Sequence, residues 1–263
     1  MPKVLWEKKN HTICITINRP EKKNCIDAET EDLLTEAWNA FKYDDDAYVA
    51  VLTGAGDESF CSGADLGGYF PKLTGGPSYL RRRAYDGPGF GGFTRGIDIF
   101  KPIICAINGL CAAGGLELAV ACDIRIASEH SAFGCLERRW NVGLGDGGTQ
   151  RLPRIVGLGR ALELIITGKL IDCEEAYRIG LVNEITPRDG ALGRALEMAE
   201  VICGFPQGAI RVDKEATMRG LGTPLTEGLR VENMLFNTLL TTHDFYEGPV
   251  AFLERRPPEY DNQ

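Results

Sequence analysis

Two glutamates in this 263-residue chain each stand beside a glycine-rich turn, where a carboxyl group could move protons. Glu117 follows Gly114 by three residues, so both would lie at the same end of a helix that begins near Gly114. Glu137 ends the otherwise apolar stretch 132–137, and burial in such surroundings raises the pKa of a carboxyl group. The two residues therefore predict general acid/base chemistry.

Two backbone N–H groups could complement these carboxyl groups. The N–H of Gly114 would be unpaired at the start of its helix, with the positive end of the helix dipole behind it. The turn FCSGADL at 60–66 is expected to leave the N–H of Ala64 free, with Asp65 capping the next helix. Two such donors that converge on one oxygen form an oxyanion hole, and each is typically worth ~3 kcal/mol of activation barrier.

A third glycine-containing segment, GLGDGGT at 143–149, opens another helix and carries Asp146. Asp146 is either a third active-site acid or the N-cap of a helix that starts near Gly148. Each of the three segments taken alone is also compatible with ordinary turn chemistry. The chain has no GxxxxGK[ST] motif and no GxGxxG after its first strand, which argues against the nucleotide-binding folds.

The elements that must hold these residues follow from the apolar pattern. Asp27 predicts the N-cap of a helix that reaches about Tyr43, and strands at 12–17 and 48–53 complete a βαβ unit around it. Further strands are expected at 4–6, 103–107, 123–127 and 181–185. Further helices are expected at 158–167, 172–179, 190–203, 207–220, 224–241 and 245–255. The segment 67–96 is predicted to be an irregular, pocket-covering loop.

Composition excludes several other classes of protein. The 37 Asp and Glu residues outnumber the 29 Lys and Arg residues, and the net charge of −8 argues against a general binder of nucleic acids or membrane surfaces. Nine cysteines without a CxxC pair, and three histidines far apart, predict reduced thiols and no metal site. The charged N-terminus lacks the apolar core of a secretory signal, so we expect a cytoplasmic protein.

The ordered set of motifs resembles the enoyl-CoA hydratase/isomerase, or crotonase, superfamily. The resemblance rests on FCSGADL (60–66), INGLCAAGGLELAVACDIRIAS (107–128), AFG-x-x-E (132–137) and GGTQRLPRIVG (147–157), with Asn18-Arg19-Pro20 and residues 247–256 in support. It covers nearly the whole chain, and only 67–100 lacks the family pattern. It implies an α/β fold, a crotonase-like spiral of ββα units over 1–204, with a C-terminal helical appendage over 205–263 used for oligomerisation as a homotrimer or homohexamer.

The resemblance also implies roles for the residues discussed above. The backbone N–H groups of Ala64 and Gly114 would hold a thioester carbonyl, Glu117 would orient and activate water, and Glu137 would exchange a proton with the α-carbon. The implied reaction is hydration of a 2-enoyl-CoA, or of a cyclic or dienoyl-CoA, in fatty acid or aromatic acid metabolism. Coenzyme A would enter as part of the acyl-CoA substrate, and no metal or redox cofactor is expected.

The coenzyme A and acyl groups need their own binding residues. The resemblance implies coenzyme A contacts at Lys22, Lys23, Cys25, Ser62, Ala64, Asp65 and Leu66. Because the chain is acidic, its phosphates require a local basic patch, expected from Arg19, Lys22 and Lys23 with Arg255 and Arg256. The acyl pocket is expected within 66–100 and at Trp140. Its aromatic residues Tyr69, Phe70, Tyr85, Phe90 and Phe93 favour a cyclic, aromatic or branched acyl group.

Other functions remain open on the same scaffold. The retention of both Glu117 and Glu137 favours hydration over isomerisation, thioester hydrolysis or C–C bond cleavage. Some isomerases of the family place a catalytic Asp where this chain has Gly145. A non-enzymatic, RNA-binding relative is disfavoured, because the helix from Asp27 to Lys42 carries an excess of acidic residues that would repel RNA.

Overall fold

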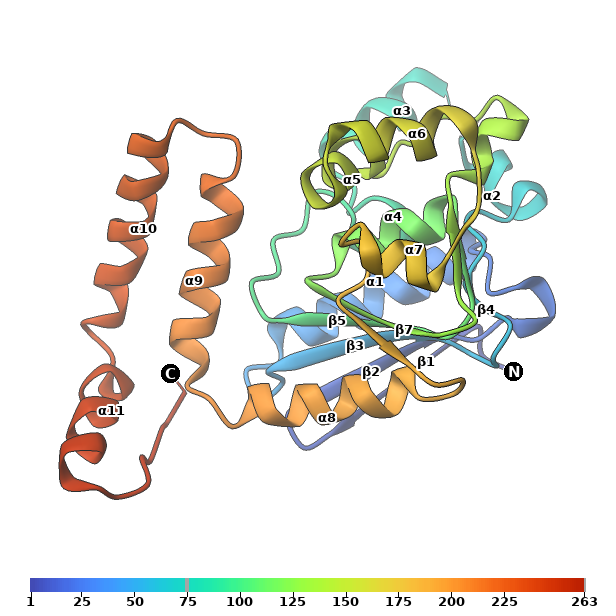
Figure 1. Ribbon diagram of the computed structural model, residues 1–263. Coiled ribbons are helices and arrows are strands. Elements are labelled where there is room, and N and C mark those ends of the chain that lie inside the picture. Colours follow the sequence, from blue (N-terminus) through green and yellow to red (C-terminus); the bar gives the residue numbers. More distant parts are fainter. Residues whose placement is uncertain (74–75, 263) are drawn as a thin grey trace. The chain divides into compact units, whose positions relative to one another are not determined.

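The computed structural model describes residues 1–73 and 76–262, and the chain forms two compact units (Figure 1). The first unit comprises Met1–Asp98 and Ile103–Ala199, and the second comprises Ile99–Pro102 and the C-terminal residues from Glu200. Within the described ranges, no helix combines the length and the apolar character needed to cross a bilayer.

A six-stranded sheet forms the centre of the first unit. Figure 1 labels its strands β1, β2, β3, β5 and β7. Its strands lie in the order β1-β2-β3-β5-β7-β10, and all neighbours are parallel except β1 and β2. The bounds are β1 Val4–Lys9, β2 Thr12–Ile17, β3 Val49–Gly54, β5 Ile103–Ile107, β7 Ile124–Ser128 and β10 Glu184–Thr186. Every residue of β3 and β5 is buried, as expected for parallel strands covered on both faces.

The predicted strand at 181–185 begins too early. The N–H groups of Leu181 and Val182 donate to the carbonyl oxygen of Ala176, so these residues close the end of the preceding helix α7 (Cys173–Arg178). The strand pairing with β7 starts at Glu184. The apolar run that predicted a strand here therefore reflects burial of Leu181 and Val182 in a turn.

A second sheet of short strands carries the segments singled out in the sequence. Its order is β4-β6-β8-β9, with bounds β4 Ser59–Cys61, β6 Leu110–Ala112, β8 Ala132–Gly134 and β9 Ile171–Asp172. The sequence did not predict these strands, because two or three residues are too few to display a period. β4, β6 and β8 are parallel and end just before Ala64, Gly114 and Glu137, respectively.

The helix α1 (Ala28–Tyr43) confirms the predicted βαβ unit between β2 and β3. The Asp27 carboxylate accepts the N–H of Thr30 at 2.8 Å, which is the expected N-cap bond. Leu34, Trp38 and Phe41 are fully buried on one face of the helix. This face fixes α1 against the core, so that Trp38 can hold a segment that borders the site.

The prediction of an irregular loop over 67–96 is wrong. This region contains α2 (Leu66–Leu73), α3 (Gly76–Tyr85) and the 3₁₀ turn η2 (Phe90–Gly92). Asp65 caps α2, because its Oδ1 accepts the N–H groups of Gly67 and Gly68 at 3.2 Å. The indole N–H of Trp38 donates to the carbonyl oxygen of Gly91 at 3.0 Å. Tertiary bonds of this kind order a segment whose glycine content indicates a loop.

The other helices follow the sequence expectations closely. The first unit contains η1 (Pro20–Lys22), α4 (Gly114–Ala121), η3 (Leu136–Trp140), α5 (Gly148–Val156), α6 (Leu158–Thr167) and α7, and α8 (Ala191–Cys203) leads into the second unit. The second unit consists mainly of α9 (Gln207–Gly220), α10 (Leu225–Leu239) and α11 (His243–Glu254). Large apolar side chains such as Leu225, Met234 and Phe252 are exposed on it. Its use in oligomerisation stays a prediction.

The nine cysteines are free thiols, and seven of them are buried. Their burial agrees with the prediction that they serve as small core residues. Burial also raises the pKa of Cys61 and Cys135 to about 12, which leaves these two thiols protonated and unreactive at neutral pH.

Backbone contact between β4 and α4 leaves no room for a side chain. A Cβ atom added at Gly115 would overlap the carbonyl oxygen of Cys61, and one added at Gly63, where φ is +98°, would lie 3.0 Å from the nitrogen of Gly114. Glycine at 115 therefore allows the turn after β4 to lie directly against the start of α4.

We predict that Gly115→Ala lowers the free energy of unfolding by about 2 kcal/mol, because overpacking against backbone costs about 3 kcal/mol and outweighs the gain in helix propensity of ~1 kcal/mol. Urea denaturation of the full chain measures this change. The matched control is Gly159→Ala in α6, where an added Cβ would have no neighbour within 4 Å and should be neutral or mildly stabilising. Unchanged stability of Gly115→Ala would contradict the steric argument.

Candidate active site

A cavity of about 500 Å³ in the first unit brings together the four predicted catalytic residues. Glu117, Glu137, Ala64 and Gly114 all line it, although they come from three segments spread over more than seventy residues. The parallel arrangement of β4, β6 and β8 explains this convergence, because all three strands end at the same edge of the second sheet.

The N–H groups of Ala64 and Gly114 remain available as donors. Ile26 pairs with the turn at Ala64 by accepting the N–H of Asp65 at 2.8 Å and donating to the carbonyl oxygen of Gly63 at 2.9 Å. This pairing uses the neighbours of Ala64 and leaves its own N–H without a partner among the described residues. Gly114 is the first residue of α4, so its N–H has no acceptor within the helix.

Ala113, the N-cap of α4, has a strained backbone. Its φ of +51° and ψ of −126° are unusual for a residue with a side chain. Its N–H donates to the carbonyl oxygen of Gly134 at 2.9 Å, which ties the turn to β8. Such strain is common where a fold must aim a group at a site, here the N–H of Gly114.

Glu117 is buried in α4 and has specific partners. Its Oε1 accepts the N–H groups of Asp146 and Gly148, both at 2.8 Å. Burial raises the pKa of Glu117 to about 7, although the two hydrogen bonds act in the opposite direction. The carboxyl group is thus fixed in place and can exchange a proton near neutral pH.

Glu137 lies in η3, and its environment differs. Its side chain is buried, and neither carboxyl oxygen has a hydrogen-bond partner in the described part of the chain. Burial raises the pKa of Glu137 above its ordinary value. A buried, unsatisfied carboxyl group costs stability, and its position on a cavity wall indicates a functional role.

Asp146 does not cap α5, contrary to one of the two interpretations above. Gly147 is the N-cap of that helix and makes no side-chain cap bond. The Oδ1 atom of Asp146 instead accepts the N–H of Phe90 at 2.8 Å and the hydroxyl of Thr94 at 3.1 Å. The cap interpretation is wrong because the side chain binds a segment more than fifty residues away in sequence. Asp146 lines the cavity, as does Gly145, and its use as a third acid stays a prediction.

The predicted aromatic acyl pocket is only partly present. Tyr69, Phe90 and Trp140 line the cavity, and the rings of Tyr69 and Phe90 meet edge to face at 5.5 Å. Phe93 does not line it, because its ring packs on Trp38 in the core with a centroid distance of 4.3 Å. Tyr85 is exposed and does not line the cavity either. The side chain of Phe70 lies outside the described residues.

The side chain of Arg95 also lines the cavity, although no sequence motif indicated it. The residue follows the glycine- and phenylalanine-rich run 89–93, within the region that lacks the family pattern. The available signal was a single arginine next to this glycine- and phenylalanine-rich run. It was missed because no family motif covers the region.

The residues predicted to contact coenzyme A divide into three groups. Ser62 and Leu66 line the cavity beside Ala64. Lys22 and Lys23 are exposed on the loop at η1, and the carbonyl oxygen of Lys23 accepts the N–H of Ser62 at 3.1 Å. These two lysines therefore belong to a loop that is bonded to the cavity lining.

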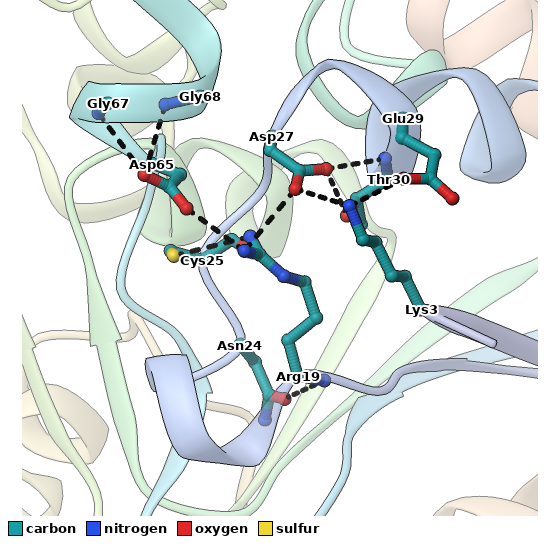
Figure 2. Close-up of polar contacts among 10 residues, drawn as sticks. All are labelled: Lys3, Arg19, Asn24, Cys25, Asp27, Glu29, Thr30, Asp65, Gly67 and Gly68. Atoms are coloured by element: carbon teal, nitrogen blue, oxygen red, sulfur yellow. Dashed lines mark hydrogen bonds and ion pairs between the residues drawn. The ribbon is translucent and has the colours of Figure 1, made fainter. Parts of the chain in front are cut away.

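Cys25 and Asp65 belong to the third group, a buried network around Arg19 (Figure 2). Arg19 donates to the carbonyl oxygen of Cys25 at 2.6 Å and to the Asp65 carboxylate at 3.0 Å, and Asp27 lies 3.3 Å away. The side chain of Arg19 is buried and occupied. The prediction that it belongs to a phosphate-binding patch is wrong, because it holds the turn at 62–65 in place.

The C-terminal arginines differ in their partners. Arg256 is paired with Glu247, with Nη2 2.8 Å from Oε2, and with Glu254 at 2.7 Å. The bond from Arg256 lowers the pKa of Glu247 to about 2 and stabilises the end of α11, and binding of a phosphate by the exposed Arg256 stays a prediction. Arg255 is exposed at the helix C-cap.

One group of side chains in the described residues has the composition of a metal site. His243, Asp244 and Asp261 of the second unit lie close together near the surface. The Asp244 carboxylate already accepts the N–H groups of Asp261 and Asn262 at 2.9 Å. This group therefore anchors the C-terminal tail to α11.

Sequence comparison relates this chain to a known family of proteins. The chain matches the family described as enoyl-CoA hydratase/isomerase over residues 7–263. It is 38% identical to the (E)-benzylidenesuccinyl-CoA hydratase of Thauera aromatica, over 98% of each chain. It is 35% identical to the crotonyl-CoA hydratase of Syntrophomonas wolfei, over 98% of this chain and 97% of the relative.

The fold agrees with solved structures of the same family. The enoyl-CoA hydratase of Bacillus anthracis is 33% identical in sequence and superposes with a TM-score of 0.88, with both chains fully covered. This likeness confirms the predicted crotonase-like α/β fold. Together with the full-length family match, it shows that the chain belongs to the enoyl-CoA hydratase/isomerase family and is an enzyme of this type.

Proposed function

We propose that this enzyme adds water to the double bond of a 2-enoyl-CoA thioester and forms the 3-hydroxyacyl-CoA. One observation carries the proposal: a single cavity is lined by two buried glutamates and by two backbone N–H groups that have no partner among the described residues. An isomerase or a thioester hydrolase needs the N–H groups but not two carboxyl groups that can divide proton transfer between them.

The N–H groups of Ala64 and Gly114 would bind the thioester oxygen. Attack at the β-carbon moves negative charge onto this oxygen, and an enolate forms. Both donors are fixed before substrate binds, because the turn after β4 and the start of α4 are in backbone contact. Stabilisation of the enolate therefore requires little reorganisation during the reaction.

The two carboxyl groups would act on different reactants: one on the water molecule and the other on the α-carbon of the thioester. Glu117, held by two backbone N–H groups, would orient the water and accept its proton while the oxygen bonds to the β-carbon. Glu137 would give its proton to the α-carbon. Water thus adds as hydroxyl and hydrogen, and proton exchange between the carboxyl groups and solvent restores the starting state.

The remaining binding functions follow from the same arrangement. We propose that the exposed Lys22 and Lys23 bind coenzyme A phosphates and that Ser62 and Leu66 contact the rest of the carrier. Proton transfer and enolate stabilisation come from the protein, so the proposed reaction uses no resident metal or redox cofactor. The second unit, with its exposed apolar side chains, is proposed to form the contacts of a homotrimer or homohexamer.

The cavity walls favour an aromatic, cyclic or branched acyl group. Tyr69 and Phe90 form an edge-to-face pair, and Trp140 adds a third ring that is 70% exposed. The relative from Thauera aromatica, named for a benzylidenesuccinyl thioester, supports a substrate with an aryl ring. Faster hydration of straight medium-chain thioesters than of aryl or cyclic ones would count against this acyl preference.

A panel of 2-enoyl-, 3-enoyl- and cyclic dienoyl-CoA thioesters in heavy-oxygen water tests the proposed reaction. Mass analysis should find the labelled oxygen in a 3-hydroxyacyl-CoA. An isomerase would shift the double bond without incorporating the label, and a hydrolase would place the label in a free carboxylic acid. Either of these outcomes as the main product would overturn the proposal.

We predict that Glu137→Gln lowers kcat for hydration by ~10²–10⁴-fold or more, because glutamine cannot transfer a proton to the α-carbon. The dissociation constant of a saturated acyl-CoA, measured by titration calorimetry, should stay within a few-fold of the original. The control is Glu163→Gln on α6, an exposed residue outside the cavity, which should leave kcat unchanged. Normal turnover of Glu137→Gln would remove it as the proton donor.

The burial of Glu117 should also affect stability. Its pKa rises from 4.5 in the unfolded chain to about 7 in the folded protein, so the folded state binds more protons between these values. The stabilisation is present below pH 4.5 and is lost as pH rises to about 7, a change of about 3 kcal/mol at 1.36 kcal/mol per pKa unit.

Urea denaturation across this range should therefore show Glu117→Gln gaining stability relative to the original chain as pH rises. The pKa of Glu163 is instead lowered by Lys169 and Arg160, so its contribution changes only below about pH 4.5. The difference in stability between Glu163→Gln and the original chain should therefore stay constant across this range. A pH-independent difference between Glu117→Gln and the original chain would contradict the buried ionisation.

A further inference from the structure

The cavity has one cationic side chain among its described lining residues, that of Arg95. The carboxyl groups that share the described cavity lining with it are those of Glu117, Glu137 and Asp146. The proposed hydration uses the glutamates and two backbone amides, and it gives Arg95 no task. A guanidinium placed in an acyl cavity with aromatic walls therefore calls for a separate explanation.

The segment that carries Arg95 is firmly held. The N–H of Arg95 donates to the carbonyl oxygen of Pro88 at 2.8 Å, and Asp146 accepts from Phe90 and Thr94. Arg151 adds a bond from Nη2 to the carbonyl oxygen of Thr94 at 2.8 Å. The fold thus fixes the backbone at Arg95, so its side chain extends into the cavity from a rigid base.

The guanidinium itself is only partly engaged. Its Nε lies 3.3 Å from Oδ1 of Asp146, and this Nε is buried without a hydrogen bond in the described chain. The same Oδ1 already accepts the N–H of Phe90 and the hydroxyl of Thr94. Asp146 therefore orients Arg95 through Nε, while Nη1 and Nη2 form no hydrogen bond or ion pair to the described residues.

Asp146 contacts both Arg95 and Glu117, the group proposed to activate water. The N–H of Asp146 holds Oε1 of Glu117, and its carboxylate faces Arg95. One residue thus connects the proposed water-activating group with the guanidinium. The side chain of Arg95 is 34% exposed, so a ligand in the cavity could reach its terminal nitrogens.

We propose that Arg95 binds a carboxylate on the acyl group of the substrate, and that the enzyme is selective for 2-enoyl-CoA thioesters that carry this second acid group. Two parallel N–H donors of a guanidinium match the two oxygens of a carboxylate. The aromatic rings of Tyr69 and Phe90 would contact the hydrocarbon part. This assignment rests on the proposed hydratase activity and adds the substrate class.

The experiment compares matched thioesters on the full-length enzyme. Each pair is an aryl-substituted 2-enoyl-CoA with a carboxymethyl group on the acyl chain, and the same compound with that acid as a primary carboxamide. The measured quantity is kcat/KM for hydration of each member. The variants are Arg95→Gln and Arg95→Lys. The matched control is Arg154→Gln, because the exposed guanidinium of Arg154 bonds, within the described residues, to Gln150 alone.

The original enzyme should prefer the carboxylate by roughly 10–100-fold, the size expected of a charge-assisted, partly exposed contact. Arg95→Gln should abolish most of this preference, because the carboxylate loses a charge-assisted contact, whereas hydration of the carboxamide should fall only a few-fold, the ordinary worth of a neutral hydrogen bond. Arg95→Lys should retain part of the preference, since lysine keeps the charge but loses the paired donors. Arg154→Gln should behave as the original.

Three results would overturn the assignment. If Arg95→Gln slowed both compounds equally, with unchanged thermal unfolding, Arg95 would be a support for Asp146 and not a substrate contact. If the original enzyme hydrated both compounds equally well, the selectivity would be absent although the proposed function would stand. If it hydrated neither these nor simple 2-enoyl-CoA thioesters, the proposed function itself would fail as well.

Discussion

Backbone contact between the turn after β4 and the start of α4 is the constraint on which the site depends. No side chain fits at Gly115 against the Cys61 carbonyl, and the strained Ala113 directs the chain into the helix at that point. The contact brings the N–H groups of Ala64 and Gly114 to one cavity wall. Backbone donors held in this way cannot rotate as side chains do, so the proposed enolate site exists before substrate arrives.

Two chemically identical carboxyl groups acquire different properties from their surroundings. Glu117 is buried but accepts two backbone N–H groups, whereas Glu137 is buried without a partner in the described structure. The first is therefore oriented and the second is left free to meet a substrate atom. When two carboxyl groups lie in different environments, one can act as the base and the other as the acid. Burial of these two carboxyl groups lowers the stability of the fold, and their proposed role in catalysis accounts for this cost.

Ionic contacts around the cavity hold the surrounding backbone segments in position. The network of Arg19, Asp27 and Asp65 in Figure 2 joins the segment before α1 to the turn that carries Ala64. Asp146 does the same on the other side, because it joins Glu117 to the segment that carries Arg95. Removing one partner of the Arg19 network would leave a buried charge without its counterpart, which costs stability.

The sequence by itself determined the fold class, the βαβ unit and the four residues proposed for catalysis, because short motifs at strand-to-helix turns dictate which N–H groups and carboxyl groups are presented. The second sheet escaped prediction, since its strands are too short to show a period. Only the tertiary structure decided that Arg19 is buried, that Asp146 binds Phe90 and that Arg95 enters the cavity. Each of these depends on contacts between residues from about 45 to more than 50 positions apart, and local pattern carries no information about such distances.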